Sequence, residues 1–445
     1  MASFTFIGLL ERHPFTLVPL AGFLLAGFIC LVLLQRGLSR LLPLFVVTVV
    51  FGYIWLKKYT FLPEGIFLHS PYFTLGLSYI FFRVLHVLIE AGEGGEKQQI
   101  GFWTYLLYTL NFTTFVSGPI QRYDEFARDQ FAAEPIALGP DVIGLQLERI
   151  VRGFFKVNVL ATILEMLRQD ALARMSFDLS PSARFFAAMC LVVLYPLFLY
   201  SNFSGYIDIV ISLARLMRLR LPENFDRPFS ATSFIDFWNR WHITLSNWLK
   251  TYVFNPLLVT LMRRISAPPL QPALGILSFF VTFFLIGLWH GRTSEFIIFG
   301  IMQGGGVAIN KLWQYGLAGA LDRKRYKALI ANPAYAAFAR GLTFSWFAFT
   351  LFWFWGSWAE IHNVFGALSA WAWLELWLAV WLCATAVLAL WEWLRAALLS
   401  IRTCEGPVFQ SRYARVMYAC AFGFTALVTT ILLNQPVPDI VYKAF

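Results

Sequence analysis

Histidine is the side chain best suited to exchange a proton near neutral pH, and one of the six histidines stands out by its position. His290 ends the run FFVTFFLIGLWH, which contains no Asp, Glu, Lys or Arg. An ionisable group in such a segment is costly unless it faces protein or a cavity, and it usually serves a function. We therefore predict that His290, beside Trp289, is a general base. By position alone, a structural role remains equally open.

A second histidine, His242, lies in the segment FIDFWNRWHITLSNWLK. If this segment is one helix, Trp238 and Ser246 lie four residues before and after His242 and share its face. The tryptophans of the segment form a stripe that is typical of packing. The polar residues Asn239, Arg240 and His242 beside the stripe instead predict the wall of a substrate tunnel. Trp238 and Ser246, on the face of His242, are further candidate tunnel residues.

Two more motifs carry polar residues on apolar segments. In YSNFSGYIDIVISLARL, Asp208 precedes Arg215 by seven residues, or two helical turns. This spacing predicts either a buried ion pair or a carboxylate that orients a histidine or the substrate. In FVSGPIQRYDEF, Gly118 and Pro119 predict a turn, and Arg122 follows it as a candidate tunnel residue.

The remaining candidates for chemistry favour structural roles. Four histidines lie near predicted span ends or on ordinary apolar segments: His13, His69, His86 and His362. Five cysteines are scattered without a CxxC pair, which argues against a disulfide framework and against a zinc site: Cys30, Cys190, Cys383, Cys404 and Cys420. We expect no bound metal.

The elements that must position these residues are membrane helices. The 445 residues are 59% hydrophobic and only 13% charged. Uncharged runs such as Phe15 to Leu34 are long enough to cross a hydrocarbon layer of about 30 Å as helices. We predict an all-α polytopic membrane protein with about ten to twelve membrane helices. The clear spans are expected near 15–34, 42–56, 66–89, 184–201, 273–289, 294–313, 341–358, 370–396 and 416–434.

The middle of the chain is apolar but interrupted by Gly, Pro and charged residues, at 101–120, 141–167 and 233–262. Polar backbone at membrane depth is tolerated only inside protein or along a cavity. We therefore expect re-entrant or tilted helices ringed around a water-filled tunnel. No soluble domain or internal repeat is evident, so residues 1–445 are predicted to form a single membrane domain.

The net charge is +10, and much of it lies in short connections between spans. These connections are predicted to be cytoplasmic by the positive-inside rule: Arg215, Arg218 and Arg220; Arg263 and Arg264; Arg323, Lys324, Arg325 and Lys327. They could contact membrane lipid headgroups, or they could dock an acidic cytoplasmic partner. No nucleic-acid partner is expected.

Four motifs, in this order, resemble the membrane-bound O-acyltransferase family: SGPIQRYDEF, NFSGYIDI, NFDRPFSATSFIDFWNRWHITLSNW and GLWHG. The resemblance covers roughly residues 72–315. It is closer to the branch that transfers D-alanyl groups to teichoic acids than to the alginate O-acetylation branch. It implies that His290 is the catalytic histidine and His242 the second signature histidine. It also implies a helical ring around a thin tunnel, which donor and acceptor enter from opposite faces.

The sequence departs from the family pattern after LWHG. A further W-x-F…W-G-x-x-H-G pattern is common in the family, whereas this chain has TSEFIIFGIMQGGG, with Gln303 and Gly304 in place of His-Gly. This difference argues against a third functional histidine and leaves the identity of the acceptor open.

The C-terminus suggests a further relationship. The D-alanylation systems resemble one another in using a small single-span partner that ends in F-x-Y-x-x-F. This chain ends in IVYKAF, where Tyr442 and Phe445 fit the pattern and Ile440 replaces the first Phe. We hypothesise that residues 416–445 resemble a fused acyl-relay partner, with Tyr442 as acyl acceptor or relay. The alternative is an interfacial aromatic anchor.

The predicted function is O-acyl transfer in the cell (plasma or inner) membrane of a bacterium. The acyl group is expected to be D-alanyl. The donor would be a phosphopantetheine thioester on an acidic acyl carrier protein at the cytoplasmic face. The acceptor would be a hydroxyl of a cell-envelope glycopolymer, a lipid or an acyl-relay protein. His242, with Asn239 or Arg240, would orient the donor or stabilise the oxyanion. No bound cofactor is expected.

Two rival functions remain open. One is O-acetylation of an alginate-like exopolysaccharide, which would use a different donor. The other is a membrane transporter or flippase, which would also account for the spans and the buried charges. Transporters often contain two related halves with interrupted helices, and the sequence has no such internal symmetry.

Overall fold

The computed structural model describes residues 2–11, 13–94, 99–175, 180–403, 406–433 and 438. Its α-helices, in chain order, are α1 (Ala2–Leu10), α2 (Val18–Gln35), α3 (Leu42–Lys57), α4 (Leu77–Gly92), α5 (Phe102–Thr109), α6 (Tyr123–Gln130), α7 (Pro140–Phe155), α8 (Thr162–Met175), α9 (Pro181–Leu216), α10 (Phe234–Arg240), α11 (Ile243–Leu249), α12 (Asn255–Arg264), α13 (Gln271–His290), α14 (Glu295–Ala320), α15 (Arg323–Ala331), α16 (Pro333–Thr350), α17 (Phe352–Trp355), α18 (Trp358–Gly366), α19 (Ala370–Ser400) and α20 (Arg412–Leu433). Two short strands, β1 (Arg402–Thr403) and β2 (Gly406–Pro407), pair antiparallel, with Arg402 opposite Pro407.

The prediction of an all-α polytopic membrane protein is confirmed. Among the described residues, seven helical segments are long and apolar enough to cross a membrane: Pro14–Gln35, Ser39–Lys57, Pro181–Leu216, Pro268–His290, Glu295–Ala320, Ala370–Ser400 and Arg412–Leu433. Two other predicted spans form shorter helices. The span at 66–89 becomes helical only at Leu77, and the span at 341–358 lies mostly in α16, which ends at Thr350.

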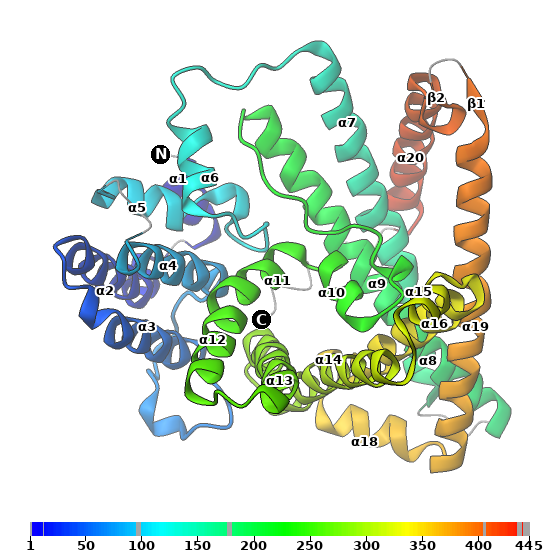
Figure 1. Ribbon diagram of the computed structural model, residues 1–445. Coiled ribbons are helices and arrows are strands. Elements are labelled where there is room, and N and C mark those ends of the chain that lie inside the picture. The colour runs from blue at the N-terminus through cyan, green and yellow to red at the C-terminus, as the bar shows by residue number, and fades with distance from the viewer. Residues whose placement is uncertain are drawn as a thin grey trace.

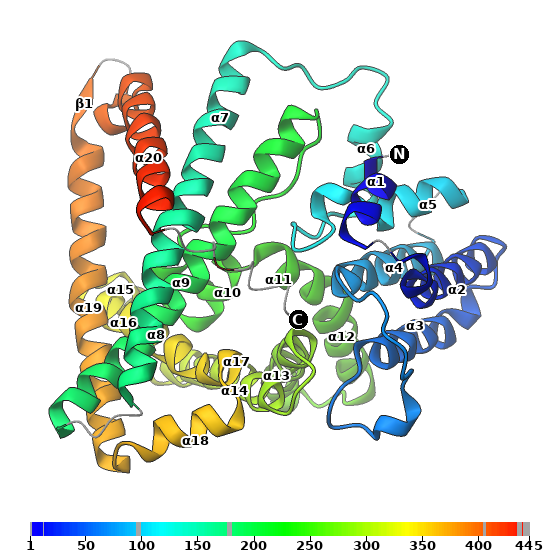
Figure 2. The same cartoon turned by 180° about the vertical axis from the view of Figure 1, so that it is seen from behind.

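The helices are arranged in a ring (Figures 1 and 2). Helices α2, α3 and α4 pack together on one side, and α7, α8 and α9 pack together on another. The α13–α14 pair lies between these groups, and α10 and α11 lie towards the middle. Helices α19 and α20 form an outer edge, where many large apolar side chains are exposed, as expected of a surface that faces lipid.

Helices α13 and α14 approach each other closely because small residues face one another. A Cβ atom added to Gly287 would lie 2.2 Å from the Cα atom of Gly300. Small residues at such an interface allow two backbones to pack tightly in a membrane. This hairpin fixes the end of α13, and therefore the position of His290.

Gln303, where the family pattern has histidine, is buried in α14 and donates to the hydroxyl of Thr350 at 2.7 Å.

The structure corrects two helix predictions. The segment around His242 is not one helix, because α10 ends at Arg240 and α11 begins at Ile243. The predicted span at 184–201 instead continues to Leu216, so the NFSGYIDI motif lies on α9. The charged segment 141–167 forms α7 and α8, which pack against α9 and are joined by a π-helical turn at Lys156–Ala161.

Candidate active site

The two motif histidines lie against the same tryptophan. The ring of Trp289 is 4.8 Å from the ring of His290 and 6.1 Å from that of His242, centroid to centroid. Both imidazoles are buried, with 3% and 0% of the respective residue surfaces exposed. The fold therefore brings together His290, His242 and Trp289, three residues that the sequence singled out, from two segments nearly fifty residues apart.

The wall around His290 is aromatic. Its ring lies 5.1 Å from that of Phe354 on α17 and 5.9 Å from that of Phe299 on α14. Gly291 follows directly, and a Cβ atom there would lie 2.0 Å from the ring of Phe296. Packing thus explains the second glycine of the GLWHG motif, because only a residue without a side chain lets Phe296 cover the end of α13.

His242 occupies an unusual backbone conformation at the start of α11. Its φ of 46° and ψ of 51° lie in the left-handed region, which residues other than glycine rarely adopt. The break places His242 between α10 and α11 and turns its side chain towards Trp289 and Phe203. Strained backbone of this kind is concentrated at functional sites.

Asn224 holds His242 and defines its tautomer. The backbone N–H and the hydroxyl of Thr244 both donate to Asn224 Oδ1, at 3.1 and 2.9 Å. A backbone N–H can only donate, so this atom is the amide oxygen. His242 Nδ1, 3.3 Å from the same oxygen, must therefore carry the proton. In neutral His242 the acceptor nitrogen is then Nε2.

Hydrogen bonds join three motif segments around His242. The hydroxyl of Thr244 accepts from the backbone N–H of Ile120 in the SGPI turn, at 3.1 Å. Phe225 forms an isolated antiparallel bridge with Trp241, and the backbone N–H of Asp226 donates to the carbonyl of Arg240 at 2.9 Å. These three segments therefore form one hydrogen-bonded unit.

Three predicted tunnel residues line one small cavity of about 40 Å³. Trp238, Asn239 and Ser246 form one side of it, and Phe283 and Ile286 of α13 form the other. The indole N–H of Trp238 is buried, with no hydrogen-bond partner among the described residues. This crevice between α10–α11 and the His290 helix brings the three predicted residues together, and their role with substrate stays a prediction.

Arg240 and Asp208 have ion-pair partners of their own. The Nε atom of Arg240 lies 3.0 Å from the Asp236 carboxylate, as the i,i+4 spacing predicts. Asp208 was expected to face Arg215, but its carboxylate instead contacts three cations of α7 and the π-helical turn: Arg149 at 2.8 Å, Arg152 at 3.4 Å and Lys156 at 2.8 Å. These contacts indicate a structural role for Asp208, in which it joins α7 to α9.

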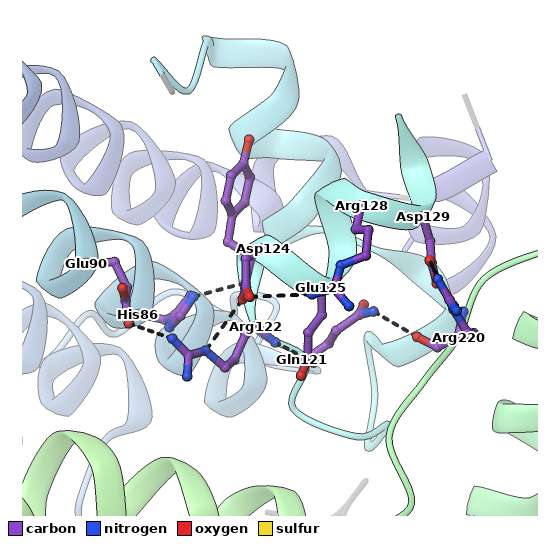
Figure 3. Close-up of polar contacts among 10 residues, drawn as sticks. His86, Glu90, Gln121, Arg122, Asp124, Glu125, Arg128, Asp129 and Arg220 are labelled. Atoms are coloured by element: carbon purple, nitrogen blue, oxygen red, sulfur yellow. Dashed lines mark hydrogen bonds and ion pairs between the residues drawn. The ribbon is translucent and has the colours of Figure 1, made fainter. Parts of the chain in front are cut away.

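Arg122 lies in a surface network, with 48% of its side chain exposed (Figure 3). Its guanidinium donates to Glu90 at 3.1 Å, and Glu90 also accepts from Tyr252 at 2.6 Å. His86 joins this network: its Nε2 accepts from the backbone N–H of Tyr123 at 2.9 Å, and its Nδ1 is 2.7 Å from the Tyr252 hydroxyl. These contacts favour a structural role for both Arg122 and His86.

A further ion pair in Figure 3 lies outside the membrane-spanning segments. Burial alone would raise the pKa of the Asp129 carboxyl, but hydrogen bonds from Arg220 outweigh that effect and lower it below its ordinary value. The guanidinium and the backbone N–H of Arg220 donate to this carboxylate at 2.6 and 2.8 Å. The pair fastens the loop after α9 to α6.

Sequence reasoning missed Asn224, Thr244 and Lys57. Asn224 could have been found, because it is the first residue of the NFDRPF motif. Lys57 is buried beside Trp289, but as the last residue of a span it resembles an ordinary positive flank.

Tyr442 lies outside the described residues. Within the described ranges, no three His, Cys, Asp or Glu side chains are grouped so that they could hold a metal ion.

Comparisons with known proteins agree with these motifs. The Teichoic acid D-alanyltransferase of Bacillus subtilis (strain 168) is 28% identical over 233 residues, which are 52% of this chain and 58% of the relative. The Teichoic acid D-alanyltransferase of Streptococcus thermophilus is 30% identical over 244 residues, which are 54% and 57%. A probable alginate O-acetylase of Pseudomonas syringae pv. tomato is 28% identical over 237 residues, which are 53% and 42%.

The aligned region thus spans less than two thirds of these relatives' length. The model of the MBOAT, membrane-bound O-acyltransferase family, matches residues 41–353, which include α3 to α16, both histidines and Trp289. This match covers well over half of the chain. The chain belongs to the membrane-bound O-acyltransferase family.

Proposed function

We propose that this protein transfers an acyl group, in the first place D-alanyl, from a thioester to a hydroxyl in a bacterial cell membrane. The observation that carries the proposal is the pair of buried histidines, His290 and His242, which both lie close to the ring of Trp289. Two relatives that align with about half of this chain are named for D-alanyl transfer to teichoic acid. The family and the site chemistry support the same reaction class.

In the proposed reaction, His290 takes the proton of the acceptor hydroxyl as its oxygen attacks the thioester carbonyl carbon. The tetrahedral intermediate collapses as the carbon–sulfur bond breaks, and the thiolate leaves. The imidazolium of His290 returns the proton to the thiolate, so the products are an ester and a thiol. General base catalysis of this kind contributes about 10²–10⁴-fold to a rate.

The tautomer of His242 supports a narrower role than oxyanion stabilisation. With Nδ1–H directed at Asn224, a neutral imidazole offers an acceptor at Nε2 and no second donor. Such a ring can orient the thioester donor by accepting a hydrogen bond from an amide N–H of its arm, which leaves the proton of the acceptor hydroxyl to His290. Asn239 and Ser246, which line the cavity described above, could donate hydrogen bonds to the arm that carries the thioester. The guanidinium of Arg240 instead forms an ion pair with Asp236.

The charge distribution supports an acidic carrier protein with a phosphopantetheine arm as the donor. Basic side chains are exposed on α15, at the end of α12 and in the loop after α9. Such clusters attract an acidic partner over a distance of about one Debye length, roughly 8 Å at physiological salt. The carrier would meet the cytoplasmic face, and the acceptor would enter the tunnel from the other face.

The experiment that tests this function supplies purified protein with a D-alanyl carrier thioester and identifies the mass added to the acceptor. We expect a D-alanyl adduct on an added glycopolymer or on Tyr442. An acetyl adduct, formed only with an acetyl donor, would favour the O-acetylation that the alginate relatives are named for. No covalent product with either donor would favour transport.

The relay hypothesis has its own prediction, the variant Tyr442→Phe. Removing the hydroxyl takes away the only nucleophilic atom of that side chain, so acyl transfer through the C-terminal tail should stop. The measurement is the amount of label bound to the protein and passed to acceptor, with Tyr413→Phe as the matched control on exposed α20. Transfer at the wild-type rate by Tyr442→Phe would contradict the relay.

A further inference from the structure

Lys57 is a buried cation that the proposed chemistry does not use. It is the last residue of α3, only 8% exposed, and no carboxylate of the described residues lies within 4.0 Å of its ammonium. A charge inside a membrane protein is costly and needs a reason. Its ammonium donates to the hydroxyl of Tyr53 at 3.0 Å and to the backbone carbonyl of Trp289.

The carbonyl contact falls at the end of the helix that carries His290. The last carbonyls of an α-helix have no partner within the helix and carry partial negative charge. Here the next residue, Gly291, is extended, with φ −142° and ψ 168°, and not the left-handed residue that often closes a helix. The end of α13 therefore depends on donors from elsewhere in the fold.

Residues 57–60 supply such donors on both sides of His290. Lys57 donates to the carbonyl of Trp289, and the Tyr59 hydroxyl donates to the carbonyl of Leu288 at 2.8 Å. The backbone N–H of Thr60 donates to the carbonyl of Arg292 at 2.9 Å. The ammonium also lies 5.9 Å from the ring centroids of both Tyr59 and Trp289. One short segment thus holds the backbone immediately before and after the proposed base.

The backbone of the segment is shaped for these contacts. Lys58 has a left-handed conformation, with φ 53°, and its side chain lies over the ring of Tyr72 at 4.5 Å. The turn at Lys58 separates the two lysines, so that Lys57 is directed at α13 and Lys58 at Tyr72. A strained residue persists only where its surroundings define it strongly.

We propose that Lys57, with Tyr59 and Thr60, is a positioning residue that clamps the end of α13 and so fixes the imidazole of His290. The inference rests on the proposed function, in which His290 is the base. An ammonium suits this place because it both donates a hydrogen bond and neutralises the negative end of the helix. A neutral side chain of the same length would leave that carbonyl without its cation.

The test compares Lys57→Met with Lys58→Met, the adjacent lysine that faces Tyr72. Acyl transfer from the D-alanyl carrier thioester is measured with purified full-length protein. We expect Lys57→Met to lower kcat by about 100-fold, as for a small misplacement of a catalytic group, with KM for the carrier unchanged. Lys57→Arg should restore most of the loss, and Lys58→Met should match the wild type. A wild-type kcat for Lys57→Met would overturn the clamp.

A second variant covers the case in which Lys57→Met does not fold. Tyr59→Phe removes one hydroxyl and no charge, and it should lower kcat roughly tenfold, the effect of one lost hydrogen bond. An unchanged kcat for Tyr59→Phe would overturn the clamp in that case.

Amide hydrogen exchange separates the clamp from the chemistry. Residues 286–292 should exchange faster in Lys57→Met than in Lys58→Met, because the end of α13 opens locally. Equal exchange would overturn the clamp. Retained turnover by His290→Ala would instead overturn the proposed function and would leave the exchange result valid.

Discussion

At the scale of single residues, the proposed site depends on side chains that hold the histidines as well as on the histidines themselves. His242 keeps a left-handed backbone because its neighbours define it: Asn224 binds the ring and the following residues, and Asp226 pairs with the carbonyl of Arg240. Asn224 is fully buried, so the loss of its amide cannot be replaced easily by water. It is the residue through which the geometry of His242 can be tested.

We predict that Asn224→Ala lowers the acyl-transfer rate by up to about 100-fold without removing either histidine. The change takes away the acceptor for His242 Nδ1–H and for Thr244, so the imidazole loses both its orientation and its fixed tautomer. The measurement is kcat with a saturating carrier thioester, with the exposed Asn363→Ala as the control. Equal rates for the two variants would contradict the role given to Asn224.

At the scale of the elements, two interfaces hold the site in place. Asp208 on α9 contacts three cations from α7 and the π-helical turn, and the side chain of Asp208 is only 9% exposed. Gly287 on α13 meets Gly300 on α14 at backbone distance. The first interface is electrostatic and the second is steric, so they predict different responses to substitution.

Asp208→Asn should destabilise the protein by about 3–5 kcal/mol, because it leaves the largely buried Lys156 without a carboxylate and takes one of two carboxylates from Arg149, which keeps Glu223. Asp170→Asn is the matched control, since its ion pair with Arg174 on α8 is exposed and contributes little. Thermal unfolding in detergent checks both variants. Similar unfolding temperatures for the two variants would show that Asp208 does not stabilise the packing of α7 against α9.

Gly287→Ala should destabilise the α13–α14 hairpin by about 1–3 kcal/mol or more, as overpacking of a core does, and should reduce activity as His290 shifts. Gly305→Ala is a fitting control, because an added Cβ atom there meets no atom within 4 Å. Unfolding temperature and acyl-transfer rate are measured together. A Gly287→Ala protein that matches Gly305→Ala in both would argue against close packing at this glycine.

The sequence predicted these elements unevenly, for physical reasons. Long uncharged runs identify α2, α13 and α20, because only helices satisfy backbone groups in lipid. The break at His242 was missed because spacing of i and i+4 fits a helix on both sides of it. The true partners of Asp208 lie more than fifty residues away, on α7 and the turn after it, and local spacing cannot reveal them.

At the scale of the whole molecule, the ring of helices brings distant motifs to one place (Figure 1). The SGPI turn, the NFDRPF segment and the His242 segment are joined by hydrogen bonds, and the end of α13 adds Trp289 and His290. The order of motifs along the chain indicated the family, and the fold explains why they occur together. The family resemblance carried the prediction further than composition alone, because composition indicates spans but no chemistry.

If His290 is the base for acyl transfer, a single-turnover measurement of His290→Ala should reveal the loss of proton transfer. Purified wild-type protein, His290→Ala and the exposed-histidine control His69→Ala receive the same D-alanyl carrier thioester and acceptor. We expect His290→Ala to remain folded but to lose about 10²–10⁴-fold in rate, while His69→Ala matches the wild type. Turnover by folded His290→Ala at the wild-type rate would show that His290 is not the base.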